Sequence, residues 1–226
     1  MFLHFKNINS KYALYDRHMH TNWTDGKNTI EEMIEAAEKL GMKEIALTDH
    51  VRGTSTYYND YVRKIKYLRK KTKVNVIIGF ECKIKNFDGE IDVNEEIKSS
   101  AEISIASVHS FPIGSKFYDA KKFHRDLCQD IEFELTMSAL KNSKFDILGH
   151  PGGVSLRYHN NFDLKYFEQI VIECVKKNIA FDLNYFYHFK IFPQLSKILE
   201  KYNPLVSLGS DAHESRHLGA WLNYFK

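Results

Sequence analysis

The stretch RHMHTNWTDG, residues 17–26, places two histidines one residue apart, at the end of an apolar run, and an aspartate five residues after the second. Residues i and i+2 of a β-strand project from the same face. His18 and His20 can therefore aim both imidazole rings at one point beyond a strand predicted over residues 14–18. A histidine pair of this kind is often only packed or exposed, so its meaning depends on the rest of the chain.

Short β-branched or apolar runs alternate with longer helical patterns along all 226 residues. The runs predicted as strands cover residues 14–18, 44–48, 74–80, 103–108, 145–149, 180–184 and 206–209. Such alternation is typical of an α/β fold with a parallel sheet. Because no low-complexity linker interrupts it, residues 1–226 are predicted to form a single domain.

Helical periodicity fills the segments between these strands. Thr29 and Glu32 have the spacing of a capping box, and Gly41 supplies a stop, which predicts a helix between them. Further helices are predicted over about residues 57–71, 120–141, 163–178 and 192–202. Between residues 82 and 96 the pattern fails, and Asp88-Gly89 indicates a turn within a short excursion.

Each predicted strand is followed by a polar side chain at its carboxyl end. These residues are His18 and His20, Asp49 and His50, Glu81, His109, His150, Asn184, and Asp211 and His213. In parallel barrels and open α/β sheets, the loops at this edge converge on one mouth, where active sites form. The sequence therefore predicts one polar site built from every strand.

The composition of this predicted site indicates metal binding. Six of the eleven histidines lie at strand ends, together with Asp25, Glu81 and Asp211. Imidazole and carboxylate groups without cysteine suit Zn, Mn or Fe better than a thiolate site or a calcium cage. Nine potential ligands exceed one coordination sphere, so two or three divalent ions are expected. A cluster of neutral histidines held by hydrogen bonds is the alternative, but its burial would cost several kcal/mol.

The motifs RHMHTNWTDG, ALTDH, GFECKI, ASVHS, LGHPGG and LGSDAH follow one another along the chain. In this order they resemble the PHP family, named for polymerase and histidinol phosphatase, over nearly the whole chain. The resemblance implies a distorted (β/α)7 barrel, similar to a TIM barrel, with a trinuclear metal centre at the carboxyl ends of its strands. The strand count reached above agrees with that fold.

The resemblance also implies roles for individual residues. His18, His20, Glu81 and Asp211 correspond to the first metal's ligands; Glu81 bridges to a second metal bound by His109 and His150; and Asp25, His50 and His213 bind the third. A hydroxide bridging the first two ions would be the nucleophile, since bound divalent ions lower the pKa of water to about 7. Asp211 or His213 is the expected catalytic proton shuttle.

Three functions are compatible with these motifs. The first is a phosphatase acting on a small phosphomonoester, with histidinol-phosphate-like substrates as the nearest named class. The second is a phosphodiesterase or 3′ exonuclease, because GFECKIKNFDGEID and ASVHS resemble PHP domains attached to family X polymerases. The third is a catalytically silent interaction module. Arg52 and Arg157 are the candidate substrate-binding cations, although both are equally compatible with exposed loop positions.

Charge and composition narrow the partners. With 32 cationic and 29 anionic side chains, the net charge of +3 argues against a nucleic-acid partner. The seven cations of residues 63–73 are expected on a solvated helix face. The absence of a long apolar run predicts a cytoplasmic protein without a membrane segment, and the three cysteines are expected as reduced core residues. A short last helix would leave one flank bare, which a homo-oligomer would cover.

Overall fold

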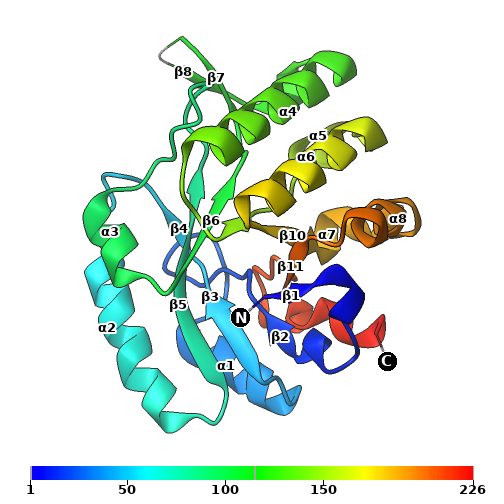
Figure 1. Ribbon diagram of the computed structural model, residues 1–226. Helices are drawn as coiled ribbons and strands as arrows, with labels where there is room; N and C mark the ends of the chain where they lie inside the picture. The colour runs from blue at the N-terminus through cyan, green and yellow to red at the C-terminus, as the bar shows by residue number, and fades with distance from the viewer. Residues whose placement is uncertain (1, 115, 226) are drawn as a thin grey trace.

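The predicted strands pair side by side in the computed structural model, which describes residues 2–114 and 116–225 (Figure 1). Seven of the strands in the nine-stranded sheet form a parallel series in which each hydrogen-bonds to the next. In sheet order these are β2 (Tyr15–Asp16), β3 (Glu44–Leu47), β5 (Asn75–Lys83), β6 (Ile103–Ser107), β9 (Ile147–Leu148), β10 (Ala180–Asn184) and β11 (Leu205–Gly209). Each lies in, or overlaps, one predicted run, so the α/β prediction is confirmed.

The two ends of this series meet, which bends the sheet into a distorted barrel. The Arg17 N–H donates to the Leu208 carbonyl oxygen at 2.9 Å, and the His20 N–H donates to the Ala212 carbonyl oxygen at 2.9 Å. Met19 and Ala212 form a parallel bridge. Residues just after β2 thus pair with β11 and with the turn beyond it, while β1 (Leu3–His4) pairs antiparallel with the start of β11.

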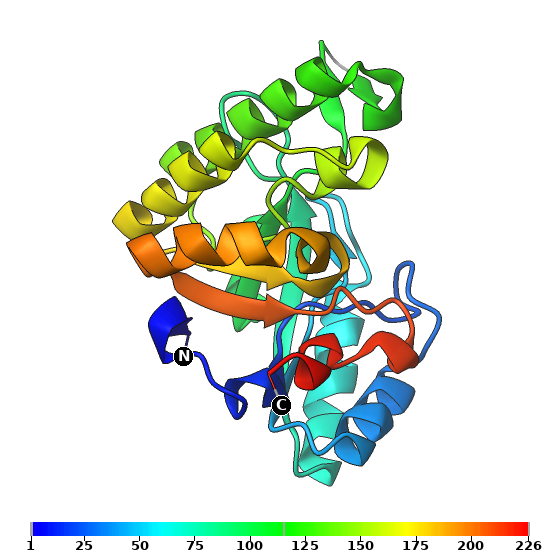
Figure 2. The ribbon, with the colours of Figure 1, turned by 90° about the vertical axis from the view of Figure 1, so that its right-hand side faces the viewer.

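The predicted helices cover the outside of the sheet. They are α1 (Ile30–Lys39), α2 (Tyr58–Leu68), α4 (Arg125–Asn142), α6 (Leu164–Lys177) and α8 (Phe192–Tyr202). Figure 2 shows α4, α6 and α8 side by side, in agreement with the contacts between them. The capping box predicted for Thr29 and Glu32 forms at the start of α1, and Gly41 adopts a positive φ of 67° just after it.

Several short elements escape periodicity because they span too few residues to show it. They are β4 (His50–Val51), α3 (Glu95–Ser100), β7 (Phe111–Ile113), β8 (Lys116–Tyr118), α5 (Gly153–His159), α7 (Tyr185–His188), and the 3-10 turns η1 (Phe5–Asn7), η2 (Tyr12–Leu14), η3 (Arg69–Lys71), η4 (Ala120–Lys122), η5 (Phe189–Ile191), η6 (Ser215–His217) and η7 (Ala220–Asn223). The helix predicted from residue 120 starts at Arg125 instead, because His124 caps it there. The predicted excursion after β5 is present, closed by an Ile84–Ile91 bridge, with Gly89 at a φ of 81°.

Strand alternation separates an apolar plug from the polar mouth. Ala46, Ile103, Ile105, Ile147 and Ala180 form a small buried cluster from four barrel strands. The same faces continue into polar residues further along, because period two keeps them pointing into the barrel. Residues of the opposite parity pack under the helices.

The cysteines lie in the outer core. Cys82, Cys128 and Cys174 are free and buried, as predicted from their apolar surroundings. Within residues 2–114 and 116–225, no helix combines the length and apolar content that crossing a membrane requires.

Candidate metal centre

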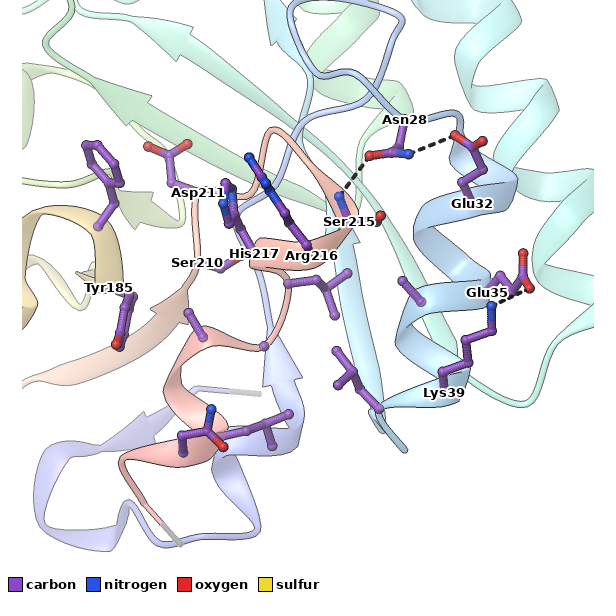
Figure 3. A pocket seen from close by; sticks show the side chains of 18 of the residues that line it. Asn28, Glu32, Glu35, Lys39, Tyr185, Ser210, Asp211, Ser215, Arg216 and His217 are labelled. Atoms are coloured by element: carbon purple, nitrogen blue, oxygen red, sulfur yellow. Dashed lines mark hydrogen bonds and ion pairs between the residues drawn. The ribbon is translucent and has the colours of Figure 1, made fainter.

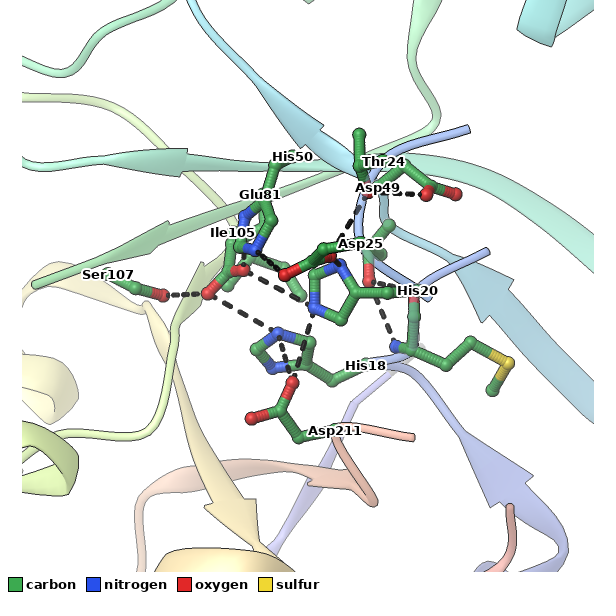
Figure 4. Close-up of polar contacts among 12 residues, drawn as sticks. His18, His20, Thr24, Asp25, Asp49, His50, Glu81, Ile105, Ser107 and Asp211 are labelled. Atoms are coloured by element: carbon green, nitrogen blue, oxygen red, sulfur yellow. Dashed lines mark hydrogen bonds and ion pairs between the residues drawn. The ribbon is translucent and has the colours of Figure 1, made fainter. Parts of the chain in front are cut away.

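The carboxyl ends of the strands bring all nine predicted ligands into one cluster, part of which Figure 4 shows. They are His18, His20, Asp25, His50, Glu81, His109, His150, Asp211 and His213, and they fall into overlapping groups whose nitrogen and carboxylate oxygen atoms lie within 4.8 Å of one another. Segments as distant in sequence as residues 18 and 213 therefore share one site.

Glu81 occupies the centre of this cluster. Its Oε1 atom lies 3.3 Å from Nε2 of His18, 3.2 Å from Nε2 of His109 and 3.0 Å from Nε2 of His150. The Ser107 hydroxyl donates to the same oxygen at 2.6 Å. One carboxylate oxygen thus faces histidines from three different strand ends.

The second oxygen of Glu81 faces a different pair of histidines. Oε2 lies 3.4 Å from Nε2 of His20 and 3.0 Å from Nδ1 of His50. The register of β4 on β5 sets His50 beside Glu81. With two oxygens turned toward separate groups, this carboxylate has the arrangement that bridging two ions requires.

Asp211 lies at the point on which the His18 and His20 rings converge. Its Oδ1 atom lies 3.6 Å from Nε2 of His18 and 3.2 Å from Nε2 of His20. Both imidazoles therefore converge on one point, as strand alternation predicts. Both rings are fully buried.

A second, more open group lies nearer the mouth. Oδ2 of Asp25 is 3.4 Å from Nε2 of His50 and 3.2 Å from Nε2 of His213. The Asp25 side chain is 53% exposed, whereas that of Glu81 is 1% exposed. The cluster thus has a buried inner part and a solvent-facing outer part.

Backbone strain marks two of the candidate ligands. His150 and Asp211 have φ values of 28° and 54°. Among the described non-glycine residues, the others with positive φ are asparagines at helix ends: Asn160, Asn178 and Asn203. Left-handed conformations of other residues store strain and concentrate at functional sites. The turns after these two strands therefore hold the His150 and Asp211 backbones in a strained conformation in which both side chains join the cluster.

Unsatisfied buried atoms test whether metal ions fit here. Nε2 of His18, both ring nitrogens of His20, Oε2 of Glu81 and Nδ1 of His150 are buried and make no hydrogen bond. Buried polar atoms normally have a hydrogen-bond partner, and imidazole with carboxylate suits divalent transition ions. The donor set therefore fits divalent transition metal ions.

The carboxylates of the inner group are held in the ionised form that metal binding needs. Burial alone would raise the pKa of Glu81, but the surrounding His109, His18 and His50 hold that pKa well below its usual range. Burial opposes ionisation of Asp211 too, and His18 and His20 lower its pKa.

Two buried carboxylates of this region were not predicted as metal ligands or catalytic residues, although Asp49 was among the predicted strand-end residues. Asp49 accepts hydrogen bonds from the Thr21 N–H and hydroxyl, both at 2.9 Å, and from the Thr24 hydroxyl at 2.7 Å. It thereby fixes the loop that carries Asp25. Asp182 contacts His18 through its Oδ2 atom at 2.9 Å. Its only sequence signal is its position two residues before Asn184, on the inward face of β10.

The candidate substrate cations differ in their surroundings. Burial raises the pKa of Tyr187, and the nearby charge of Arg157, on α5, opposes that rise. The Tyr187 ring packs against His150 with centroids 5.1 Å apart. Arg157 therefore stands beside the metal centre. Arg52 is exposed and follows His50 by two residues. Burial and the nearby charge of Arg52 both lower the pKa of Lys83.

A cavity of about 1050 Å³ adjoins the cluster and was not predicted from the sequence (Figure 3). It lies between α1 and the turns η6 and η7; Tyr185, Ser210 and Asp211 line one end, and Glu35 and Lys39 lie at the other. Asp211 belongs to both the cavity and the cluster, so the cavity and the cluster adjoin at this residue.

No feature of the described residues tests the homo-oligomer expected from the sequence, which stays a prediction.

A seven-stranded barrel that gathers imidazole and carboxylate groups at the carboxyl ends of its strands defines a metal-dependent hydrolase. The family model described as the PHP domain matches residues 16–186, and the chain belongs to this family. The matched range contains seven of the nine candidate ligands, whereas Asp211 and His213 follow it.

Known proteins of several kinds are similar to this chain. The DNA polymerase/3'-5' exonuclease PolX of Bacillus subtilis is 26% identical over 181 residues, which are 75% of this chain but only 28% of that protein. A probable histidinol-phosphatase of Thermotoga maritima is 28% identical over 219 residues, covering 91% of this chain and 87% of the relative. The histidinol phosphate phosphatase of Lactococcus lactis, solved with zinc, L-histidinol and phosphate, shares the fold with a TM-score of 0.71, 17% identity and 93% coverage of both chains.

His188 lies next to the site but is not part of it, and its burial makes the free energy of unfolding depend on pH. Its buried ring accepts from the Asn184 N–H at 3.1 Å and donates to the Pro151 carbonyl oxygen at 2.9 Å, and burial lowers its pKa to about 4. The unfolded chain has a histidine pKa near 6.5. Stability from this group is therefore fully present above about pH 6.5 and is lost as the pH falls toward 4.

We expect metal-free wild-type protein to lose more unfolding free energy between pH 7 and pH 5 than His188→Gln does. The expected difference is about 1 to 2 kcal/mol, measured by urea unfolding at both pH values. The other histidines titrate in both proteins, so they cancel in the comparison. Equal losses would show that the fold does not lower the pKa of His188.

Proposed function

We propose that this protein is a phosphatase that hydrolyses a small phosphomonoester with two or three bound divalent transition ions. The observation that carries the proposal is the position of Glu81, whose two buried oxygens face five histidines from four strand ends. Zinc in the Lactococcus lactis enzyme, together with L-histidinol and phosphate, supports a histidinol-phosphate-like substrate class.

The ligand assignment is the one that the resemblance to the PHP family implies. The groups of close ligand atoms overlap with it but divide the residues differently, with His150 beside His18 and Glu81, and His109 beside His50 and Glu81. His18, His20, Glu81 and Asp211 would bind the first ion; Glu81, His109 and His150 the second; and Asp25, His50 and His213 the third. Two contacts support shared ligands: His50 also approaches Glu81 at 3.0 Å, and Nδ1 of His20 lies 3.8 Å from Asp25. Zn, Mn and Fe all suit this donor set.

Bound ions would supply a water molecule with a pKa near neutrality and positive charge for the phosphate oxygens. The chain itself would position the ester. Arg157, whose charge acts on Tyr187 beside His150, would donate to phosphate oxygens. The cavity next to Asp211 would receive the organic part of the substrate.

Asp211 and His213 are the proposed proton-transfer groups for the leaving oxygen. Nδ1 of His213 donates to the Asp211 carbonyl oxygen at 2.9 Å, which leaves Nε2 facing Asp25 and the mouth. Although burial favours the neutral ring, the Asp25 and Asp211 carboxylates raise the pKa of His213. If the third ion does not occupy Nε2, a protonated His213 at the mouth is suited to give a proton to the departing alcohol. This role and ligation of the third ion by His213 exclude each other, because both need the same ring nitrogen.

The surroundings of the mouth favour a monoester over a nucleic-acid diester. Six of the seven cations of residues 63–73 lie on α2 and η3, and three of them, Arg63, Lys64 and Arg69, pair with Asp60, Glu31 and Glu102. These cations therefore belong to a helix face that ion pairs partly neutralise. The PolX match is the observation that favours exonuclease activity instead.

Turnover of a monoester panel and of single-stranded DNA, each at two salt concentrations, tests the proposal. We expect faster monoester turnover with a shallow salt dependence, because few cations contact a single phosphate. Arg157→Ala and Arg52→Ala should lower kcat/KM by about tenfold to a few hundredfold, the effect of losing a charge-assisted hydrogen bond.

Arg63→Ala, on the outer face of α2, is the matched control and should leave kcat/KM unchanged. Faster DNA cleavage with a steep salt dependence, and no effect of Arg52→Ala or Arg157→Ala on monoester turnover, would establish the exonuclease reading instead. A metal-loaded protein without activity on either substrate class would favour the interaction module.

A further inference from the structure

Asp182 lies inside the barrel on β10 and is fully buried. We propose that Asp182 is a positioning residue that fixes two ligands of the inner ions, His18 and His150, at once. This inference rests on the proposed metal centre and deepens it, because it assigns a function to a carboxylate that would not itself touch an ion.

One oxygen of Asp182 gathers three donors from three strands. Oδ2 lies 2.9 Å from Nδ1 of His18, 3.0 Å from the backbone nitrogen of His150 and 3.3 Å from Nδ2 of Asn184. His18 follows β2, His150 follows β9, and Asn184 ends β10. The carboxylate therefore ties together strand ends that are far apart in sequence.

The contact with His18 determines which ring nitrogen is free. A ring that donates from Nδ1 to Asp182 has only Nε2 left for a metal ion, and that atom lies 3.3 Å from Glu81 and 3.6 Å from Asp211. A carboxylate on the far nitrogen of a histidine fixes its tautomer and orientation and makes it a stronger metal ligand.

The contact with His150 acts on the backbone instead. His150 has a φ of 28°, a conformation that a side chain disfavours, and its N–H donates to Asp182. That hydrogen bond holds the strained turn, and the turn aims Nε2 of His150 at Glu81, 3.0 Å away. The His18 and His150 rings stack with centroids 5.6 Å apart, so the two positions are coupled.

The surrounding packing leaves room for this carboxylate. A Cβ atom at Gly209 would lie 2.4 Å from Oδ1 of Asp182 and 2.8 Å from Cβ of His18. Glycine at this position allows both side chains to approach. Oδ1 itself is buried without a hydrogen bond, which is costly for folding alone and therefore points to a role in the site.

Metal affinity of Asp182→Asn, measured by Mn²⁺ titration in chelator buffers, tests the proposal without any substrate. The amide matches the carboxylate in shape but loses its charge and offers a donor to His18. We expect about a 10- to 100-fold loss of affinity for the two ions that share Glu81, while the ion bound through Asp25, His50 and His213 keeps its affinity. Elemental analysis after dialysis should show one equivalent retained.

Glu132→Gln is the matched control. Glu132 is also a buried carboxylate that accepts two backbone hydrogen bonds, from Val154 at 3.0 Å and Ser155 at 2.8 Å. We expect it to lower the unfolding temperature of the metal-free protein about as much as Asp182→Asn does, without a change in Mn²⁺ affinity. A structural role for Asp182 would make the two variants alike in both measurements.

The visible spectrum of the Co²⁺-loaded protein is a second readout, and we expect Asp182→Asn to change it while Glu132→Gln does not. If Asp182→Asn does not fold, Asp182→Glu, which keeps the charge but moves the oxygens, is measured in its place with the same expectation. Unchanged Mn²⁺ affinity in a folded Asp182 variant would overturn this proposal alone. Wild-type protein that binds no Mn²⁺ would overturn the metal centre as well.

Discussion

Glu81→Gln is expected to lower kcat by about 1000-fold or more, at or above the upper end of the loss seen when one hydrogen-bond donor is removed from a prearranged site. The wild-type carboxylate has two anionic oxygens, one facing His18, His109 and His150 and the other facing His20 and His50. An amide keeps the shape but has only one acceptor oxygen and no charge. It cannot bridge two cations, so bound metal should fall together with turnover.

Cys82→Ala is the control for this substitution, because Cys82 is the next residue of β5 and points to the opposite face. Its thiol is buried in the outer core, where it contacts the Ile105 carbonyl oxygen at 3.4 Å. We expect some loss of stability from the lost core contacts but kcat within about twofold of wild type. Equal losses of turnover in two folded variants would contradict the assignment of faces on β5.

Removal of metal is the second change with a large expected effect. Protein purified without a chelator should contain two to three equivalents of transition metal per chain, because nine ligand-type side chains converge at the mouth. Chelation should abolish phosphatase activity, and added Mn²⁺ or Zn²⁺ should restore it. Elemental analysis with a monoester assay before and after chelation measures both.

The same treatment should lower thermal stability. An ion present at about 100 times its Kd stabilises the folded state by about 2.7 kcal/mol, which corresponds to about 5 to 10 °C in Tm for a chain of this size. Differential scanning calorimetry with chelator, and with chelator plus excess Mn²⁺, gives the shift and its control. One equivalent of metal or fewer, with no gain in activity on adding metal, would contradict the multinuclear centre.

Much of the fold and the site follows from local sequence. Strand alternation placed His18 and His20 on one face, and the capping box at Thr29 located the start of α1. Both features depend only on residues two or three positions apart, so they can be predicted without knowing which distant segments pack together. The polar residues after the predicted strands included eight of the nine candidate ligands, and the ninth, Asp25, came from the loop that follows His18 and His20 in the first motif.

Other features exist only in the tertiary structure. Asp182 and His18 are 164 positions apart, and Asp49 holds a loop that begins 28 positions earlier, so no periodicity connects either pair. Register decides which oxygen of Glu81 meets which histidine, and that register is set by β4 and β6 packing on either side of β5.

The cavity beside Asp211 has the same origin, because its walls come from α1 and from turns near the other end of the chain. The sequence by itself determined the ligand types and the strand faces that carry them, since side-chain chemistry and period two are local properties. Only the tertiary structure decided which groups meet, which carboxylate supports them and where a ligand has room, because these depend on distances between strands that folding brings together.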